Sequence, residues 1–87
     1  MDKPLPLTLD ALPRDASARI AEVQGNDAVS RRLREMGLLA GQSVRRSGTA
    51  PLGDPAIYFV RGFRLALRRA EARRVLIDQS SVEPAVD

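Results

Sequence analysis

The chain of 87 residues contains neither cysteine nor histidine, and these two absences exclude several classes of function. Without cysteine there is no disulfide staple and no thiol nucleophile, and without histidine there is no Cys/His zinc site. The remaining acid–base candidates are scattered carboxylates, one lysine and one tyrosine, and no activating pair is visible. We therefore expect no catalytic residue, no cofactor and no metal ligand set.

Long hydrophobic runs are also missing. The longest uninterrupted apolar run, residues 56–60, is far shorter than the roughly 20 residues that cross a bilayer. The start of the chain shows no basic segment followed by an apolar one, as a secretory signal peptide would. The expected location is the cytoplasm, and the length allows one domain.

The net charge of +3 hides an uneven distribution. Residues 1–30 carry three basic and five acidic side chains (−2), residues 31–74 carry eleven arginines and three acids (+8), and residues 75–87 carry three acids (−3). Arginine suits carboxylate and phosphate partners because its planar guanidinium binds them with two hydrogen bonds. Acidic protein surfaces, phospholipid headgroups and nucleic acid are therefore all open as partners at this point.

One segment has clear helix signals. Asn26 or Asp27 is a favourable N-cap, and Val29, Leu33 and Met36 follow at helical spacing. Gly37 suits the left-handed position that ends a helix, and the next residue, leucine, would fold back onto the last turn.

The other elements are short. Alternating apolar residues predict strands at 16–23, around Val44, and at 56–61, 64–68 and 75–77. A type II′ turn at 62–63 is expected to join two of them, with regular structure excluded from 48–55 and one helical turn at 70–73. Residues 1–15 are expected to be a lead-in that packs on the domain of residues 16–78, and residues 79–87 a disordered tail. The sequence thus predicts a mainly β fold with short helices: a small, partly open β-barrel of about five strands, with one helix inserted after the first.

Three motifs stand in a fixed order: RLREMGLLAG at 32–41, APLGDP at 50–55 and RGFRLALR at 61–68, followed by Glu71 and Ala72. In this order the chain resembles the FeoA family, ferrous iron transport protein A. The residues of the motif to which we assign structural roles are Leu33, Gly37, Leu38, Gly41, Pro51, Gly53, Asp54, Pro55, Gly62, Leu65, Leu67 and Ala72.

The resemblance implies an SH3-like barrel without catalysis of its own. It implies a non-enzymatic cytoplasmic accessory protein that binds the cytoplasmic part of an FeoB-type membrane Fe(II) transporter and supports or regulates Fe(II) uptake. The same fold occurs as the C-terminal domain of iron-dependent repressors, so a regulatory module is one alternative. Nucleic-acid binding by a basic barrel is another, but we expect none, because only three aromatic side chains are available to stack on bases.

A partner surface is predicted on the strand 56–61. Alternation places Ala56, Tyr58 and Val60 toward the core and points Ile57 and Phe59 outward beside arginine, as at the centre of an interface. The alternative is that Leu5, Leu7 and Leu9 of the lead-in cover this pair; self-association is also open. The full set of candidate partner-binding residues is Arg31, Arg34, Leu39, Arg45, Ile57, Phe59 and Arg61, of which Arg31, Arg34 and Arg45 are expected to be exposed.

Overall fold

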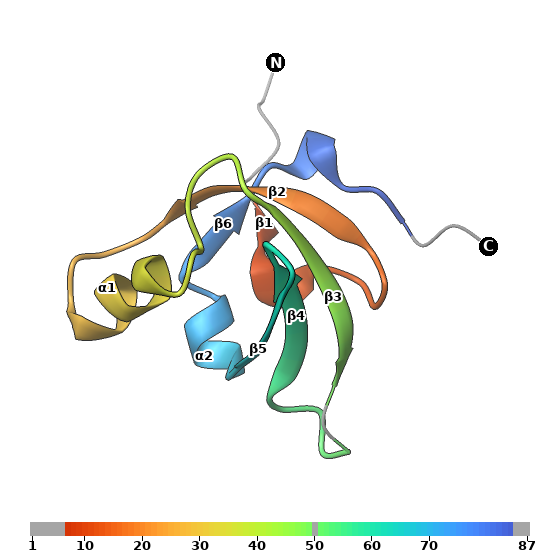
Figure 1. Ribbon diagram of the computed structural model, residues 1–87. Helices are drawn as coiled ribbons and strands as arrows, with labels where there is room; N and C mark the ends of the chain where they lie inside the picture. Colours follow the sequence, from red (N-terminus) through yellow and green to blue (C-terminus); the bar gives the residue numbers. More distant parts are fainter. Residues whose placement is uncertain (1–6, 50, 85–87) are drawn as a thin grey trace.

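The computed structural model of the protein describes residues 7–49 and 51–84, which form one antiparallel sheet with short helices (Figure 1). The six strands are β1 (Leu7–Thr8), β2 (Ser17–Val23), β3 (Ser43–Thr49), β4 (Ala56–Val60), β5 (Phe63–Leu67) and β6 (Val75–Ile77). The helices are α1 (Ala28–Glu35) and α2 (Arg69–Ala72), with 3-10 turns η1 (Leu9–Ala11) and η2 (Gln79–Ser81). The expected mainly β fold with a helix after the first long strand is confirmed, and the short β1 adds a sixth strand.

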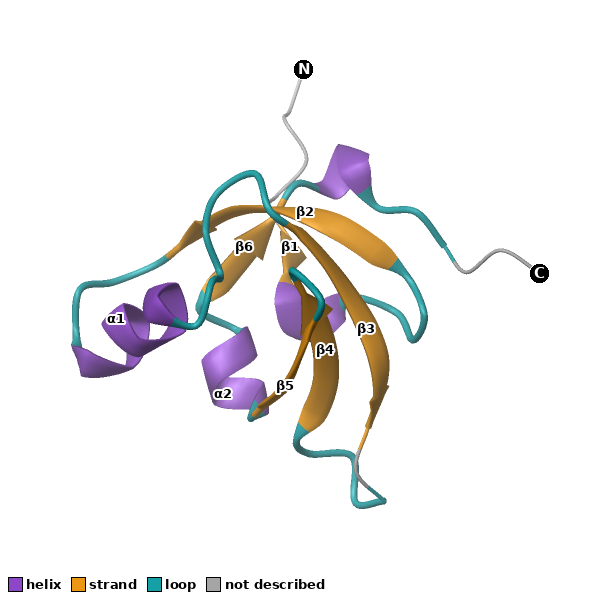
Figure 2. Cartoon of the chain, in the orientation of Figure 1, coloured by secondary structure: helices purple, strands orange, loops and turns teal. Residues whose placement is uncertain are grey.

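The strand order β1-β6-β2-β3-β4-β5 makes β2 the link between the two halves of the sheet. Residues 17–19 pair with β3, and the register with β6 begins at Ile20 and shifts before Glu22. Such an irregularity bends a strand, and Figure 2 shows β2 arching over the other elements. The sheet therefore wraps around a core, and within the described residues its edge strands β1 and β5 do not pair with each other.

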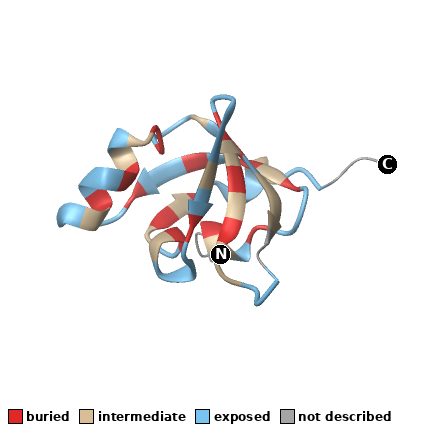
Figure 3. Ribbon diagram, turned by 60° about the horizontal axis from the view of Figure 1, so that its bottom comes forward, coloured by how far each residue is buried: buried red, intermediate tan, exposed pale blue. Residues whose placement is uncertain are grey.

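The inner face of the sheet and the lead-in share one core (Figure 3). Leu9 and Leu12 have no exposed area, and the Tyr58 hydroxyl donates to the Leu9 carbonyl at 3.5 Å. The buried apolar residues are Leu9, Leu12, Ala16, Ala18, Ile20, Val23, Leu33, Leu38, Val44, Ala56, Tyr58, Val60, Leu67, Ala72, Val75 and Ile77. Among residues 7–49 and 51–84, no helix is long and apolar enough to cross a bilayer.

Both ends of α1 form as the sequence predicts. Asp27 caps the helix, because its carboxylate accepts the Ser30 amide at 3.0 Å. Gly37 takes a φ of +103°, its amide donates to Arg34, and the Leu38 amide donates to Leu33. This pair of bonds is the Schellman motif, which satisfies the last carbonyls of the helix and places Leu38 in the core.

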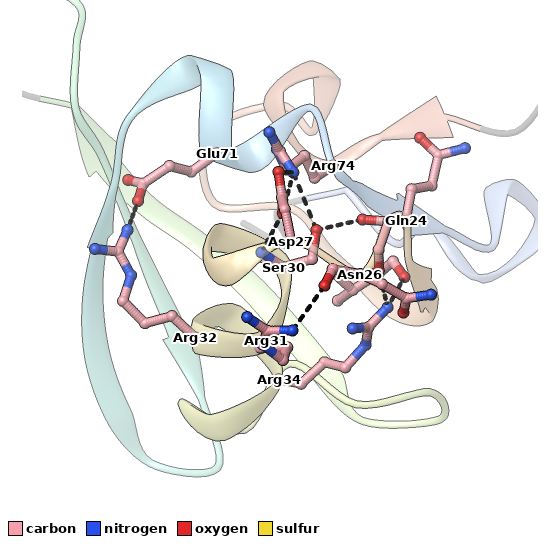
Figure 4. Close-up of polar contacts among 11 residues, drawn as sticks. Gln24, Asn26, Asp27, Ser30, Arg31, Arg32, Arg34, Glu71 and Arg74 are labelled. Atoms are coloured by element: carbon pink, nitrogen blue, oxygen red, sulfur yellow. Dashed lines mark hydrogen bonds and ion pairs between the residues drawn. The ribbon is translucent and has the colours of Figure 1, made fainter.

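A polar network ties the start of α1 to the segment before β6 (Figure 4). Arg74 donates to both carboxylate oxygens of Asp27 at 2.6 Å and to the hydroxyl of Ser30 at 3.1 Å. The Ser30 hydroxyl donates in turn to the Gln24 carbonyl at 2.5 Å, so this fully buried serine connects three elements. Its burial was not anticipated, because serine lies outside the apolar stripe of the helix.

The turn between β4 and β5 was predicted one residue out of place. Val60 pairs with Phe63, so the two turn residues are Arg61 and Gly62, and both have positive φ, +55° and +83°. Two positive φ values define a type I′ turn, not the expected type II′ turn with glycine first. The twist of the strands favours type I′ strongly enough that an arginine occupies a left-handed conformation.

Two segments are more ordered than expected. β3 continues through Gly48 and Thr49 into the segment predicted to lack regular structure, with a register shift between Arg46 and Gly48 that leaves Ser47 without a pairing partner in β4. Residues 79–84 were expected to belong to a disordered tail, but η2 forms there and Glu83 exchanges two backbone hydrogen bonds with Ser17, at 2.9 and 2.8 Å. Residues 85–87 lie outside the described residues.

Substituting Arg61 by asparagine should stabilise the protein. An arginine at φ +55° is strained, whereas asparagine followed by glycine is the preferred type I′ pair, so we expect a gain of up to about 1 kcal/mol. Thermal unfolding of the variant measures this. A melting temperature below that of the wild type would show that the Arg61 side chain stabilises the fold by more than its backbone strain costs.

The Asp27–Arg74 contact should make stability depend on pH. Its hydrogen bonds, first from Arg74 and then from the Ser30 amide, lower the pKa of Asp27 from 3.8 to about 2. The charged carboxylate therefore stabilises the fold fully above pH 3.8, and this contribution is lost as the pH falls through about 2. We expect Asp27→Asn to lower the urea midpoint at neutral pH and the difference to shrink toward pH 2. A difference independent of pH would contradict this assignment.

Candidate interaction surface

The outer surface of β3, β4 and β5 brings together part of the predicted partner-binding set. In the observed register Arg45, Phe59 and Arg64 lie side by side across the three strands. The next outward-facing row consists of Gly48, Ile57 and Ala66. We call these six residues the Ile57–Phe59 face.

The chemistry of this face is apolar at its centre and cationic at its sides. The Arg45 guanidinium lies over the Phe59 ring, 5.5 Å from its centroid, in a cation–π arrangement. Phe59 and Ile57 are half-buried, while Arg45 and Arg64 are exposed. Ile57 is flanked on the two neighbouring strands by Gly48, which has no side chain, and by Ala66, which has only a methyl group. An apolar pair between arginines is the composition that protein interfaces favour.

The described part of the lead-in lies on the other side of β4. Leu9 is buried in the core and receives the Tyr58 hydroxyl bond, and Leu7 pairs with Ile77 at the far edge of the sheet. Residues Leu7 and Leu9 therefore do not cover the Ile57–Phe59 face. Leu5, the third residue of that alternative, lies outside the described residues.

Two other candidates, Arg31 and Arg34, are engaged within the molecule (Figure 4). Arg34 is half-buried, contrary to expectation, and donates to the carbonyls of Val23 and Gly25 at 2.7 and 2.6 Å. Arg31 is exposed and donates to the Asn26 carbonyl at 3.1 Å. Both side chains hold the loop that leads into α1. Part of the positive charge of residues 31–74 therefore has a structural role that needs no binding partner.

The last two candidates lie near the end of α1. The Arg61 side chain approaches to 3.6 Å from the position that a Cβ on Gly37 would take, and Leu39, two residues further on, is 43% exposed. Neither belongs to the Ile57–Phe59 face.

Three surface residues were missed. Arg64 completes the cationic rim of the Ile57–Phe59 face, and Phe63 and Leu52 are exposed by 68% and 95%. Correct placement of the turn at 61–62 would have revealed Phe63 and Arg64, because it fixes which residues of β5 oppose Val60 and Phe59. The sequence signal for this turn is Gly62, because a type I′ turn prefers glycine at its second position.

Motif residues in and near the loop before β4 connect this loop to α2. Asp54 accepts the Arg69 amide at 3.0 Å, and Glu71 accepts the Arg68 amide at 2.9 Å and forms an ion pair with Arg32. A polar hollow of about 330 Å³ opens there, lined by Asp10, Arg46, Gly53, Asp54, Ala56, Tyr58, Arg69 and Arg73. Burial raises the pKa of Tyr58 at its floor. Within residues 7–49 and 51–84 no three carboxylates gather as a metal site would require.

The remaining motif residues occupy core or turn positions. Leu33, Leu38, Leu67 and Ala72 are buried, and Leu65 and Pro55 are half-buried. Gly41, Gly53 and Gly62 have positive φ, and Pro51 is exposed beside Gly53 in the loop before β4.

Comparison with known proteins gives consistent results. Residues 7–79 match the family model described as FeoA domain. The chain is 29% identical over 72 residues to the Fe(2+) transport protein A/Fe(2+) transporter FeoB fusion protein of Porphyromonas gingivalis, a match that covers 83% of this chain and 8% of that relative. The chain thus spans less than a tenth of the curated relative that it matches.

Two solved structures share the fold closely. The FeoA of Stenotrophomonas maltophilia, an SH3 domain protein solved in complex with zinc, is 42% identical with a TM-score of 0.84, covering 92% of this chain and 99% of that one. The FeoA-like protein of Clostridium acetobutylicum is 26% identical with a TM-score of 0.79, covering 87% and 88%. The sheet described above is therefore an SH3-like fold, as the resemblance implied.

The two faces of β4 should respond differently to substitution. Val60 is 1% exposed and its replacement by serine removes core packing and buries a hydroxyl, which should cost on the order of 2–3 kcal/mol. Phe59→Ser removes a larger but half-buried side chain and should cost clearly less. Thermal unfolding of the two single variants compares them. A larger loss for Phe59→Ser would identify Phe59 as core and end its role as a surface anchor.

Proposed function

Since the chain belongs to the FeoA family, which is associated with ferrous iron transport, we propose that it is a non-enzymatic cytoplasmic accessory protein that binds the cytoplasmic part of an FeoB-type transporter. In this role it supports or regulates Fe(II) uptake by the transporter. The transporter is the partner, and the Ile57–Phe59 face is the contact.

The observation that carries the proposal is the fusion of the two proteins in a relative. In Porphyromonas gingivalis an FeoA segment that resembles this chain is covalently joined to FeoB. Fusion holds two modules at an effective concentration in the millimolar range, so that even a weak contact between them is formed most of the time. With or without such a fusion, docking requires a complementary surface on the FeoA module.

The Ile57–Phe59 face supplies such a surface. Its aromatic centre and its arginines are the residue types that dominate binding energy when they are buried at an interface. The arginines Arg45 and Arg64 also match an acidic partner surface, which speeds encounter and fixes the orientation of docking. Because Ile57 and Phe59 are already half-buried, they lose less side-chain entropy on docking than fully exposed side chains would.

Titration with the cytoplasmic domain of an FeoB-type transporter tests the proposal. We expect binding by calorimetry, and repeating the titration with GDP and with a GTP analogue shows whether the nucleotide state controls it. No binding in either nucleotide state, with folded protein on both sides, would contradict the proposal.

Two single variants test the surface. Phe59→Ala removes the aromatic centre and Arg45→Glu reverses a flanking charge, and each should weaken binding by about tenfold or more. Arg14→Glu, at an exposed position in the turn before β2 and outside this face, makes the same change in net charge as Arg45→Glu and is its matched control. Equal weakening by Arg14→Glu would mean that net charge, and not this face, drives binding.

A further inference from the structure

The strand β5 forms a full-length open edge of the sheet. It stands last in the strand order and pairs only with β4, whereas the opposite edge, β1, has two residues. An open edge presents unpaired backbone amides and carbonyls, which are a template for another strand. Proteins protect such edges with proline, bulges, inward-pointing charges or exposed charges, and of these devices β5 has only the exposed charge of Arg64.

The register identifies the groups that face outward. In a two-residue hairpin the pair that closes the turn, here Val60 and Phe63, exchanges both backbone hydrogen bonds, and bonded and non-bonded pairs alternate from there. The backbone groups of Arg64 and Ala66 therefore point away from β4, toward the open edge. In the part of the chain that the structure describes, no other segment hydrogen-bonds to them.

The bonding of β3 agrees with this assignment. The Arg46 amide donates to Ala16 at 3.0 Å, so the backbone of Arg46 faces β2 and away from β4. Its partner Tyr58 then turns its own backbone groups toward β5, where it pairs with Leu65. Alternation along β5 again leaves Arg64 and Ala66 free.

A hollow with both apolar and charged walls lies along the C-terminal part of this edge. It has a volume of about 560 Å³ and is lined by Arg32, Met36, Pro55, Ala66, Leu67, Arg68 and Glu71, so α1 and α2 stand across from β5. Near the other end of the strand the inward-facing Phe63 is 68% exposed and Leu65 is half-buried. Apolar side chains of an added strand would be covered on this inner side.

The charges along the edge select the partner. Arg64 lies in β5 and Arg68 directly follows it, and both side chains are exposed. A second copy of β5 would bring the arginines of both strands into one ladder, where like charges repel. Acidic side chains opposite Arg64 would instead form favourable cross-strand pairs. Self-pairing is thus disfavoured and an acidic strand is favoured.

We propose that β5 accepts an extended segment of the partner as an additional strand, and that this segment alternates apolar with acidic residues. Its apolar side chains lie over Phe63 and Leu65 on the inner side, and its acidic ones lie beside Arg64 on the outer side. Backbone hydrogen bonds to Arg64 and Ala66 supply the affinity, and the alternation supplies specificity. The inference rests on the proposed function, because the transporter contributes the segment.

Amide hydrogen exchange of the wild-type protein with the transporter's cytoplasmic domain is the first test. The amides of Arg64 and Ala66 point to solvent in the free protein and should exchange fast, whereas those of Phe63 and Leu65 are bonded to β4. On binding, protection should increase at least tenfold at Arg64 and Ala66. Unchanged exchange at both positions in a complex that forms would overturn the inference.

A proline at the edge is the second test. Ala66→Pro removes an amide that faces the open edge, where proline is tolerated, and should weaken binding by tenfold or more. Ala28→Pro makes the same substitution at the exposed first residue of α1, where proline is tolerated, and is the matched control, expected within about twofold of wild type. If Ala66→Pro does not fold, the exchange measurement on the wild type still decides the question.

The outcomes separate the two proposals. Binding of the wild type that is lost in Ala66→Pro, with protection at Arg64 and Ala66, supports both. Equal binding of Ala66→Pro and wild type without that protection leaves the transporter as partner and overturns the added strand. No binding of the wild type overturns the proposed function and the added strand with it.

Discussion

The two-residue alternation along β4 is the constraint on which core and surface both depend. Ala56, Tyr58 and Val60 are buried because they point inward, and the same pleat obliges Ile57 and Phe59 to point outward. A shift of one residue would exchange the two sets, burying a different group and presenting a tyrosine to solvent. The core thus fixes the composition of the outer face, and selection on one side of the strand constrains the other.

Local signals in the sequence were sufficient for α1 and for the faces of β4. Asp27 and Gly37 act on backbone groups within a few residues, so their effect can be read without knowing the fold. Three features depend on distant residues and could not be read in this way. β1 exists because Leu7 reaches Ile77, Ser30 is buried because Arg74 and Gln24 meet its hydroxyl, and η2 is held by contacts to β2.

The arrangement of the outer face could be predicted in part for a related reason. Strand alternation gave the outward direction of Ile57 and Phe59, and Arg45 is exposed as expected, whereas the position of Arg64 beside Phe59 required the exact register of a turn. Charge alone was a poor guide to the arginines of α1. Arg34 binds loop carbonyls and Arg32 pairs with Glu71, so part of the basic character of residues 31–74 is used to hold the fold. The number of arginines in a segment does not show how many of them face a partner.

The pinning of Glu83 to Ser17 has a consequence for anything attached after Pro84. The two backbone bonds fix the exit of the chain at β2, on the far side of β3 and β4 from the open edge. A purification tag, a fluorophore or a second domain joined at this point would leave from beside β2. Because Ser17 also pairs with Arg45, such an attachment lies next to the Arg45 side of the Ile57–Phe59 face, whereas β3 and β4 separate it from the edge of β5.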